Sequence, residues 1–347
     1  RAPATDPAPD DTPRRPPAAG ATTTHGIHGI AIDMTHSSPL AFFTICSKNF
    51  LAYAHTLHDS LQAQHPGAKF YVALCDRLDG MVDPAAEPFE ILPMETLGIP
   101  DLAGMIERYN ITELNTSIKP FVFEYLFEHR GEARVVYLDP DILVVSPLAD
   151  VDAALGRDAC AVMTPHVLDP AEHVEIDDIK MLQLGIYNLG FLALARSPRV
   201  LEIVRWWQRR LERQCVIDLP NGLFVDQKWA DLLPCFIPDT LILRHPGYNV
   251  AYWNLQQRKV ERRDGAWLSN GQPLVFVHFS GNNLNDETVF SRHSWQLNAG
   301  NERAVACKNR RRDICADSLR CQDFERIEPG DQFKTPSPRC QRRKQIG

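Results

Sequence analysis

The chain has 347 residues, a formal net charge of −7, and hydrophobic and charged fractions of 44% and 23% that are ordinary for a globular protein. It contains no apolar run of the roughly 18–20 residues that a membrane-spanning helix needs, and its first residues lack the pattern of a signal peptide. The nine cysteines are scattered, which favours a reducing compartment over a disulfide framework. We therefore expect a globular, cytoplasmic protein of one or two domains.

The two ends of the chain differ in composition from its middle. Residues 1–37 are rich in small and polar residues at their start and cannot bury enough apolar surface to form a core, so we expect a disordered segment. Residues 301–347 carry twelve Lys+Arg against seven Asp+Glu, a net of +5, and we expect a basic, disordered tail that is compatible with peripheral contact with an anionic membrane. The four cysteines of this tail are not spaced as in common zinc sites. We expect no nucleic-acid partner. These limits leave residues 38–300 as a single catalytic domain.

Strands and helices alternate along that domain. The apolar patterns predict the following elements in chain order: a strand over 40–46, a helix over 50–64, a strand over 69–75, helices over 102–109 and 116–128, a strand within 135–145, strands over 160–163 and 187–195, a helix over 199–211, and a strand over 274–279. Such β-α-β alternation indicates an α/β protein with a mainly parallel sheet flanked by helices.

One of these strands ends in two carboxylates. Residues 135–145 read Val-Val-Tyr-Leu-Asp-Pro-Asp-Ile-Leu-Val-Val, so that Asp139 and Asp141 follow an apolar, β-branched stretch. Ligands of open α/β sheets bind just outside the carboxyl ends of strands, and hard carboxylate oxygens suit Mg²⁺ or Mn²⁺. The alternative is an Asp-Pro-Asp turn between two strands, because both residue types favour turns.

Three further segments carry polar residues in apolar surroundings. Asn188 and Gly190 interrupt an apolar strand, where glycine marks either close approach of another group or a bulge. Asp226 and Gln227 open a helical stretch, in which Asp226 could serve only as an N-cap. His278 follows a late strand and could be a hydrogen-bonded structural residue.

The order of these segments resembles that of the GT-A nucleotide-sugar glycosyltransferases, most closely the retaining family 8 type that includes glycogenin and bacterial galactosyltransferases. The resemblance covers about residues 40–295. The matching segments are 43–50 (Phe-Thr-Ile-Cys-Ser-Lys-Asn-Phe), 116–120 (Thr-Ser-Ile-Lys-Pro), 139–141 (Asp-Pro-Asp, the D-x-D motif), 187–190 (Tyr-Asn-Leu-Gly), 226–227 (Asp-Gln), 246–249 (Pro-Gly-Tyr-Asn) and 278–281 (His-Phe-Ser-Gly).

The resemblance implies a role for each matching residue. It implies an ion, Mn²⁺ or Mg²⁺, held by Asp139, Asp141 and His278, and a sugar-binding and catalytic group of Asn188, Asp226 and Gln227. The residues implied for the nucleotide are Thr44, Cys46, Asn49, Lys119, Asp139, Asp141 and Gly281. The family's late motif continues to Lys-Pro-Trp, whereas Asn282-Asn283-Leu284 follow here, so Arg292 or His293 is the expected replacement for that basic contact.

The function implied is metal-dependent transfer of a hexose from a nucleoside diphosphate sugar, with UDP the expected nucleotide, and with retention of configuration. The acceptor would be a saccharide, a lipid-linked saccharide or a protein, as in the biosynthesis of bacterial surface polysaccharides. Three alternatives stay open: a haloacid-dehalogenase phosphatase or a nucleotidyltransferase using Asp139 and Asp141, and a catalytically inactive relic that binds sugar nucleotides.

Overall fold

The computed structural model of the chain describes residues 38–170, 177–281, 291 and 293. The segments expected to be disordered, 1–37 and 301–347, lie outside the described residues, and so does Arg292. In the part of the chain that is described, no helix combines the length and the apolarity that crossing a membrane requires.

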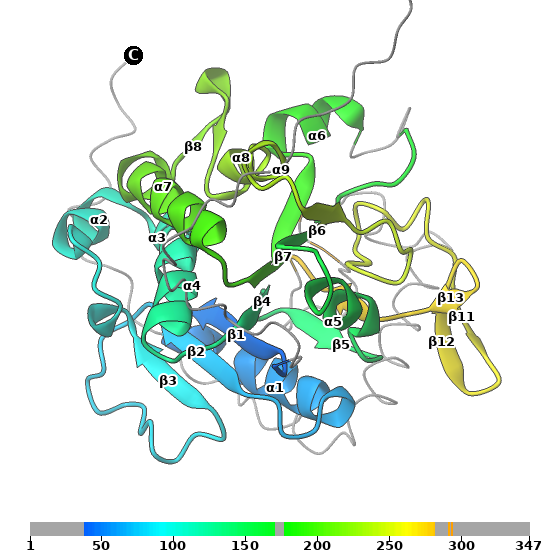
Figure 1. Ribbon diagram of the computed structural model, residues 1–347, viewed down its shortest axis with the longest axis horizontal. Helices are drawn as coiled ribbons and strands as arrows, with labels where there is room; N and C mark the ends of the chain where they lie inside the picture. The colour runs from blue at the N-terminus through cyan, green and yellow to red at the C-terminus, as the bar shows by residue number, and fades with distance from the viewer. Residues whose placement is uncertain (1–37, 171–176, 282–290, 292, 294–347) are drawn as a thin grey trace, which may run out of the picture. The chain divides into compact units, whose positions relative to one another are not determined.

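A seven-stranded sheet in the order β10-β6-β7-β4-β1-β2-β3 forms the centre of the described fold (Figure 1). The strands are β1 (Ala41–Cys46), β2 (Phe70–Leu74), β3 (Glu90–Pro93), β4 (Arg134–Leu138), β6 (Ala161–Pro165), β7 (Tyr187–Ala195) and β10 (Thr240–Ile242). The pairings β1–β2, β1–β4, β2–β3 and β6–β10 are parallel, whereas β7 pairs antiparallel with both β4 and β6. The predicted α/β class with a mainly parallel sheet is therefore confirmed.

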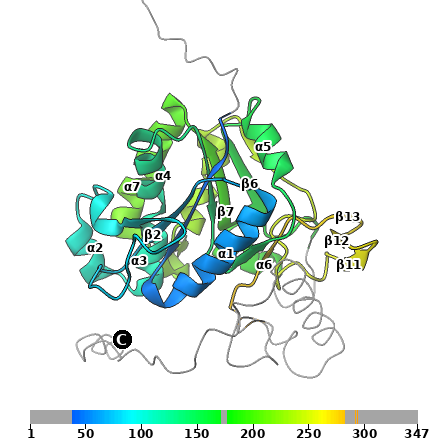
Figure 2. The same cartoon turned by 90° about the horizontal axis from the view of Figure 1, so that it is seen from below.

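Helices cover both faces of this sheet (Figures 1 and 2). The first apolar cluster packs on one face and includes side chains of α2 (Leu102–Arg108), α3 (Ile111–Ser117), α4 (Lys119–Glu128) and α7 (Pro198–Gln214). The second packs on the other face with side chains of α1 (Leu51–Gln64) and α5 (Ala149–Leu155). Burial of large apolar side chains on both faces, including Phe42, Phe43 and Trp207, supplies the main driving force for this layered packing.

The smaller elements complete the described fold. They are β5 (Ile142–Val144) paired with β14 (Phe276–His278), β8 (Ile217–Asp218) paired with β9 (Leu223–Phe224), the sheet of β11 (Val260–Arg263), β12 (Ala266–Ser269) and β13 (Gln272–Pro273), and the short helices α6 (Asp178–Leu184), α8 (Gln227–Ala230) and α9 (Leu233–Phe236).

The predicted helix over 116–128 is wrong in one respect, because it is two helices. α3 ends at Ser117 and α4 begins at Lys119, with Ile118 between them. Pro120 has no N–H to continue the hydrogen-bonding of a preceding helix, but it is well accommodated in the first turn of a new one.

The order of the strands reverses beside β1. The chain proceeds from β1 to β2 and β3 on one side and then returns to place β4 on the other side of β1. Because β1 and β4 are parallel, with Phe43 opposite Tyr137, their carboxyl ends leave the same edge. Such reversals of strand order are where open α/β sheets bind ligands, and Asp139 follows β4 at this point.

Candidate functional site

The acidic pair and the turn proposed as its alternative are one and the same feature. β4 ends at Leu138, and the amide of Ile142 donates to the carbonyl of Asp139 over 3.1 Å, which closes a turn. The amide of Asp139 is fixed separately, because it donates to the carbonyl of Gly190 over 2.8 Å. The predicted strand is therefore interrupted after Leu138, and the turn presents the carboxylates at the edge of the sheet.

His278 reaches the carboxylates because β14 pairs antiparallel with β5. This pairing sets His278 opposite Ile142, and the amide of Phe279 donates to the carbonyl of Asp141 over 2.9 Å. The Nε2 atom of His278 lies 3.1 Å from Asp141 Oδ1 and 3.5 Å from Asp139 Oδ2. One ligand atom from each of the three residues lies within 4.8 Å of the others. Residues 137 positions apart in sequence thus converge on one point.

The chemistry of this group fits a divalent ion. Two carboxylates and one imidazole offer oxygen and nitrogen ligands of the kinds that Mn²⁺ accepts, whereas Mg²⁺ binds oxygen almost exclusively. Burial raises the pKa of Asp139 even though Lys119 and His278 oppose this shift. Burial alone would lower the pKa of His278, but the charges of Asp141 and Asp139 raise it. The site therefore favours a positive charge between its three side chains.

Lys119 lies beside this group but is closed to solvent. Its ammonium group is ion-paired with Asp226, donates to the carbonyl of Leu189 over 2.9 Å, and lies 4.1 Å from the centre of the Tyr137 ring. The hydroxyl of Tyr137 in turn donates to Asp139. The expected contact of Lys119 with a phosphate stays a prediction, since all its described contacts are within the protein.

Asp226 and Gln227 are both buried at the start of α8. Asp226 precedes the helix but makes no side-chain capping hydrogen bond, and its carboxylate is ion-paired with Lys119. Burial raises the pKa of Asp226, and Lys119 opposes this shift. The amide of Gln227 accepts from the backbone N–H of Leu189 over 3.1 Å and donates to the carbonyl of Leu184 over 2.9 Å. These contacts connect α8 to the strand β7, which carries Asn188, and to the end of α6.

Gly190 leaves room for the ring of His278. A Cβ atom at this position would overlap Cε1 of His278 and would also lie 2.7 Å from its Nδ1. The glycine that interrupts the predicted strand therefore marks close approach, and the group that approaches is a side chain of the protein. The neighbouring Asn188 is buried, and its Oδ1 accepts from the amide of Gly190 over 3.1 Å.

The residues predicted to contact the nucleotide are divided between core and surface. The side chains of Thr44 and Cys46 are closed to solvent in β1, and burial raises the pKa of the Cys46 thiol to about 12, so this thiol stays neutral. Asn49 is exposed in the short 3₁₀ helix that follows β1. Gly281 has a φ of +72° and lies directly against His293, one of the two expected basic replacements.

Several residues beside the site make contacts that sequence reasoning did not predict. Tyr137 could have been found, because residues two apart in a strand point to the same side and Asp139 follows at that spacing. Asp76 accepts from the amide of Lys48 over 2.8 Å, and Ser47 accepts from Asn115 over 3.3 Å, both beside the predicted nucleotide segment. No local pattern pointed to these two contacts, because each joins separate parts of the chain.

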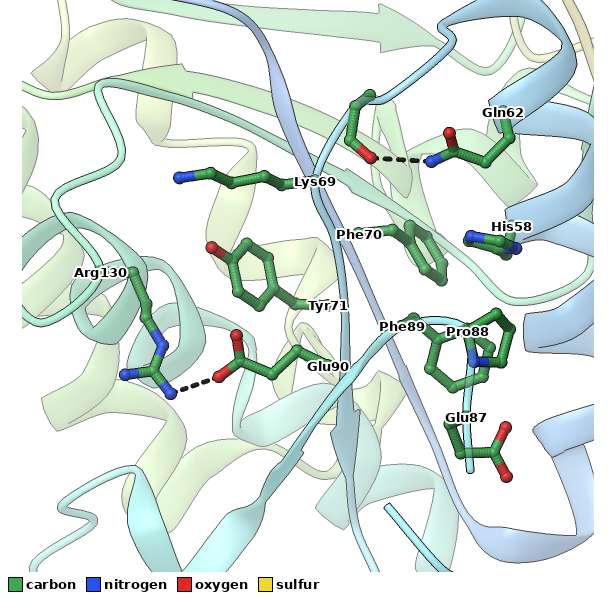
Figure 3. Close-up of a pocket in the computed structure, with 11 residues that line it drawn as sticks. His58, Gln62, Lys69, Phe70, Tyr71, Glu87, Pro88, Phe89, Glu90 and Arg130 are labelled. Carbon is green, nitrogen blue, oxygen red and sulfur yellow. Dashed lines mark hydrogen bonds and ion pairs between the residues drawn. The ribbon is translucent and has the colours of Figure 1, made fainter. Parts of the chain in front are cut away.

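A separate hollow of about 780 Å³ lies where β2 and β3 begin, at the opposite ends of these strands from the acidic group (Figure 3). Of its lining residues, Arg130 pairs with Glu90, whereas Lys69 pairs with Glu132 at 2.7 Å and Glu87 contacts His55 at 2.7 Å, both partners lying outside the lining. The hydroxyl of Tyr71 also donates to Glu132 over 2.7 Å. Among the described residues, the lining of this hollow contains no group of metal-ligating side chains like that of Asp139, Asp141 and His278.

Comparison with known proteins gives relatives of unassigned activity. No protein-family model matches the chain. It is 26% identical to the uncharacterized protein YfnF of Bacillus subtilis (strain 168) over 248 residues. These aligned residues make up 70% of this chain and 81% of YfnF. It is 23% identical over 263 residues to the uncharacterized protein YfnD of the same organism, covering 73% of this chain and 81% of YfnD.

The solved structures that are similar to the chain include glycosyltransferases. The galactosyltransferase LgtC, in complex with donor and acceptor sugar analogues, has a TM-score of 0.47 and 16% identity, covering 80% of this chain and 95% of LgtC. A glycosyltransferase involved in glycosylation of the major capsid of PBCV-1 has a TM-score of 0.42 and 11% identity. The match covers 70% of this chain and 93% of that glycosyltransferase chain.

Proposed function

We propose that the chain is a GT-A glycosyltransferase of the family 8 type, which transfers a hexose from a nucleoside diphosphate sugar to an acceptor hydroxyl. The observation that carries this proposal is the convergence of Asp139, Asp141 and His278 at the reversal of strand order. These residues come from two of the motifs that resemble that family, and they meet where a ligand of an open α/β sheet would lie.

The proposed ion would stabilise the leaving group of the reaction. Breaking the bond between the sugar and the diphosphate leaves negative charge on the leaving group. A bound Mn²⁺ or Mg²⁺ supplies Lewis-acid stabilisation of that charge. In this chain, Asp139, Asp141 and His278 would hold the ion. His293, which lies against Gly281, would add a basic group for the diphosphate.

The sugar would lie beside the Lys119–Asp226 pair. Asp226 and Gln227 are fastened to the strand that also bears Asn188, so these groups form one buried polar wall next to the acidic turn. We propose that Asp226 accepts from a sugar hydroxyl and that Gln227 steadies positive charge at the anomeric carbon. An amide is a weak nucleophile, which favours attack by the acceptor on the leaving-group face and hence retention.

The partners follow from this chemistry. We propose UDP-hexose as the donor, and a saccharide, lipid-linked saccharide or protein hydroxyl as the acceptor, in the assembly of a surface polysaccharide. The proposed location is the cytoplasm, where nucleotide sugars are made.

The first test is a thermal-shift screen of nucleoside diphosphates with and without Mn²⁺, followed by donor hydrolysis and transfer assays. A ligand at a hundred times its dissociation constant should stabilise the fold by about 2.7 kcal/mol. Asp141→Ala should abolish Mn²⁺-dependent stabilisation by UDP and lower turnover at least about a hundredfold, because it removes a ligand of the ion. Glu107→Ala, at an exposed position on α2, is the matched control.

Two results would contradict the proposal. Full turnover in a strong chelator would remove the role of the ion. Binding of a sugar nucleotide without hydrolysis or transfer, across a panel of donors and acceptors, would identify the chain as a binding relic.

A further inference from the structure

A continuous chain of buried polar side chains lies behind His278. The contacts run from His278 Nδ1 to Asn249 Oδ1 at 3.2 Å, from Asn249 Nδ2 to Asn188 Oδ1 at 3.0 Å, from Asn188 Nδ2 to His166 Nε2 at 3.2 Å, and from His166 Nδ1 to the carbonyl of Ile186 at 3.2 Å. All four side chains are buried. Because each group must donate or accept in turn, fixing the direction at one end fixes it throughout.

Two backbone groups set that direction independently. The carbonyl of Ile186 can only accept, so the proton of His166 resides on Nδ1. Burial lowers the pKa of His166 to about 4, so its ring is neutral and its Nε2 accepts from Asn188. The N–H of Gly190 can only donate, which independently turns the oxygen of Asn188 towards Gly190 and its NH₂ group towards His166.

The same direction continues to His278. Since the oxygen of Asn188 accepts, the NH₂ group of Asn249 donates to it, and that group also donates to Thr164 Oγ1 over 2.9 Å. The remaining oxygen of Asn249 faces Nδ1 of His278. An amide oxygen cannot donate, so Nδ1 must carry a proton.

The backbone around Asn249 is built to hold this arrangement. Asn249 has a φ of +53°, in the left-handed region that asparagine tolerates better than most residues. Asn254 donates to the carbonyl of Asn249 over 3.0 Å, and the amide of His278 donates to the carbonyl of Val250 over 2.9 Å. The ring of Trp253 meets the ring of His278 at 88° with centroids 5.1 Å apart. A strained backbone held on several sides is typical of functional positions.

We propose that Asn249 is a positioning residue, which keeps the neutral imidazole of His278 in the tautomer protonated on Nδ1 and so directs the lone pair of Nε2 at an ion between Asp139 and Asp141. This inference depends on the proposed function in one respect only, namely that the bound ion serves sugar transfer. Metal-bound histidines commonly donate their other N–H to such a partner, which fixes both the tautomer and the ring. Asn188 then supports Asn249. The side-chain oxygen of Asn188 accepts two hydrogen bonds within the protein, one from the amide of Gly190 and one from the NH₂ group of Asn249.

The first test is made on the wild-type protein without metal. Multiple-bond ¹H–¹⁵N spectra of ¹⁵N-histidine-labelled protein at about pH 9, where histidine is ordinarily neutral, distinguish the two tautomers. The signals of His278 are identified by their loss in His278→Gln. We expect a protonated Nδ1 and a bare Nε2. A proton on Nε2, or a mixture of tautomers, would overturn the inference whether or not the protein transfers sugars.

The second test compares two asparagines in left-handed backbone. Asn249→Gly removes the amide but keeps a residue suited to that backbone, and Asn270→Gly makes the same change at an exposed turn with a φ of +50°. Titration with Mn²⁺, followed by the electron paramagnetic resonance signal of the free ion, should show about 10- to 100-fold weaker binding for the first variant only. Unchanged affinity in folded Asn249→Gly would overturn the proposal.

A third variant separates positioning from a merely structural role. Asn249→Asp keeps an oxygen that can accept from Nδ1 but removes the NH₂ group. We expect it to retain the tautomer and most of the Mn²⁺ affinity. Loss of Mn²⁺ binding equal to that of Asn249→Gly would show that the network acts only by holding the fold, and would refute the positioning role.

Discussion

At the scale of single residues, substitutions in the pair of Lys119 and Asp226 can distinguish a structural role of this pair from a functional one. Their side chains are only 2% and 3% exposed, so loss of one partner leaves the other as an uncompensated buried charge. Asp226→Ala should therefore lower the free energy of unfolding by about 3–5 kcal/mol. The double variant Lys119→Met/Asp226→Leu should recover much of this loss, because replacing both charges by apolar groups removes the penalty.

Urea unfolding measures the stability of these variants, and a transfer assay measures their function. If Asp226 binds the sugar as proposed, the double variant is stable but does not transfer. A double variant with near wild-type transfer would show that the pair only holds α4 to the segment before α8.

The buried ring of His166 predicts a dependence of stability on pH. Its folded-state pKa of about 4 lies below the ordinary value of 6.5, so the unfolded chain binds this proton first as the pH falls. The stabilisation is thus fully present above about pH 6.5 and is lost progressively towards pH 4, by up to about 3 kcal/mol. Denaturant melts at several pH values should give a slope in this window that is smaller in His166→Gln. Equal slopes for both proteins would contradict the prediction.

At the scale of elements, apolar runs predicted the central strands well. β1, β2 and β7 lie where continuous apolar stretches predict them, because strands buried on both faces need such sequences. β3 and β10 have four and three residues and were missed, since so short a run has no periodicity of its own. The antiparallel direction of β7 depends on contacts with β4 and β6, which no local pattern encodes.

The three residues of the candidate ion site could be predicted from the sequence for a related reason. Asp139 and Asp141 follow an apolar strand and match a short motif, and the β5–β14 pairing brings His278 beside them. The support by Asn249 was not predicted, because its contacts join segments 29 and 61 residues apart. Motifs identify residues that perform chemistry, whereas the partners that orient them are visible only after folding.

The packing of β7 against β14 gives a further prediction. Gly190→Ala would place a Cβ where the ring of His278 lies, so the ring must move away from Asp139 and Asp141. We expect weaker Mn²⁺ binding by about tenfold or more, with the secondary structure retained, because the displaced ring loses its orientation towards the ion. Titration with Mn²⁺ and circular dichroism test the two parts. Wild-type Mn²⁺ affinity in Gly190→Ala would mean that His278 does not bind the ion.

At the scale of the whole molecule, charge is distributed unevenly along the chain. Residues 301–347 carry +5, so the total of −7 leaves −12 for residues 1–300, which contain every motif discussed. The proposed donor, an anionic sugar nucleotide, would approach such a region against its net charge, and an ion bound at the proposed site would neutralise part of that charge locally. A basic tail would instead attract anionic surfaces.

This asymmetry predicts the result of truncation. A chain limited to residues 38–300 should keep donor hydrolysis, because it retains the acidic turn, His278 and Gly281 together with the sheet that positions them. It should bind vesicles of anionic lipid more weakly than the full chain, and the difference should vanish at high salt because the attraction is electrostatic. Hydrolysis rates and vesicle sedimentation measure the two effects. A folded truncated chain that hydrolyses none of the donors used by the full chain would place part of the active site in residues 301–347.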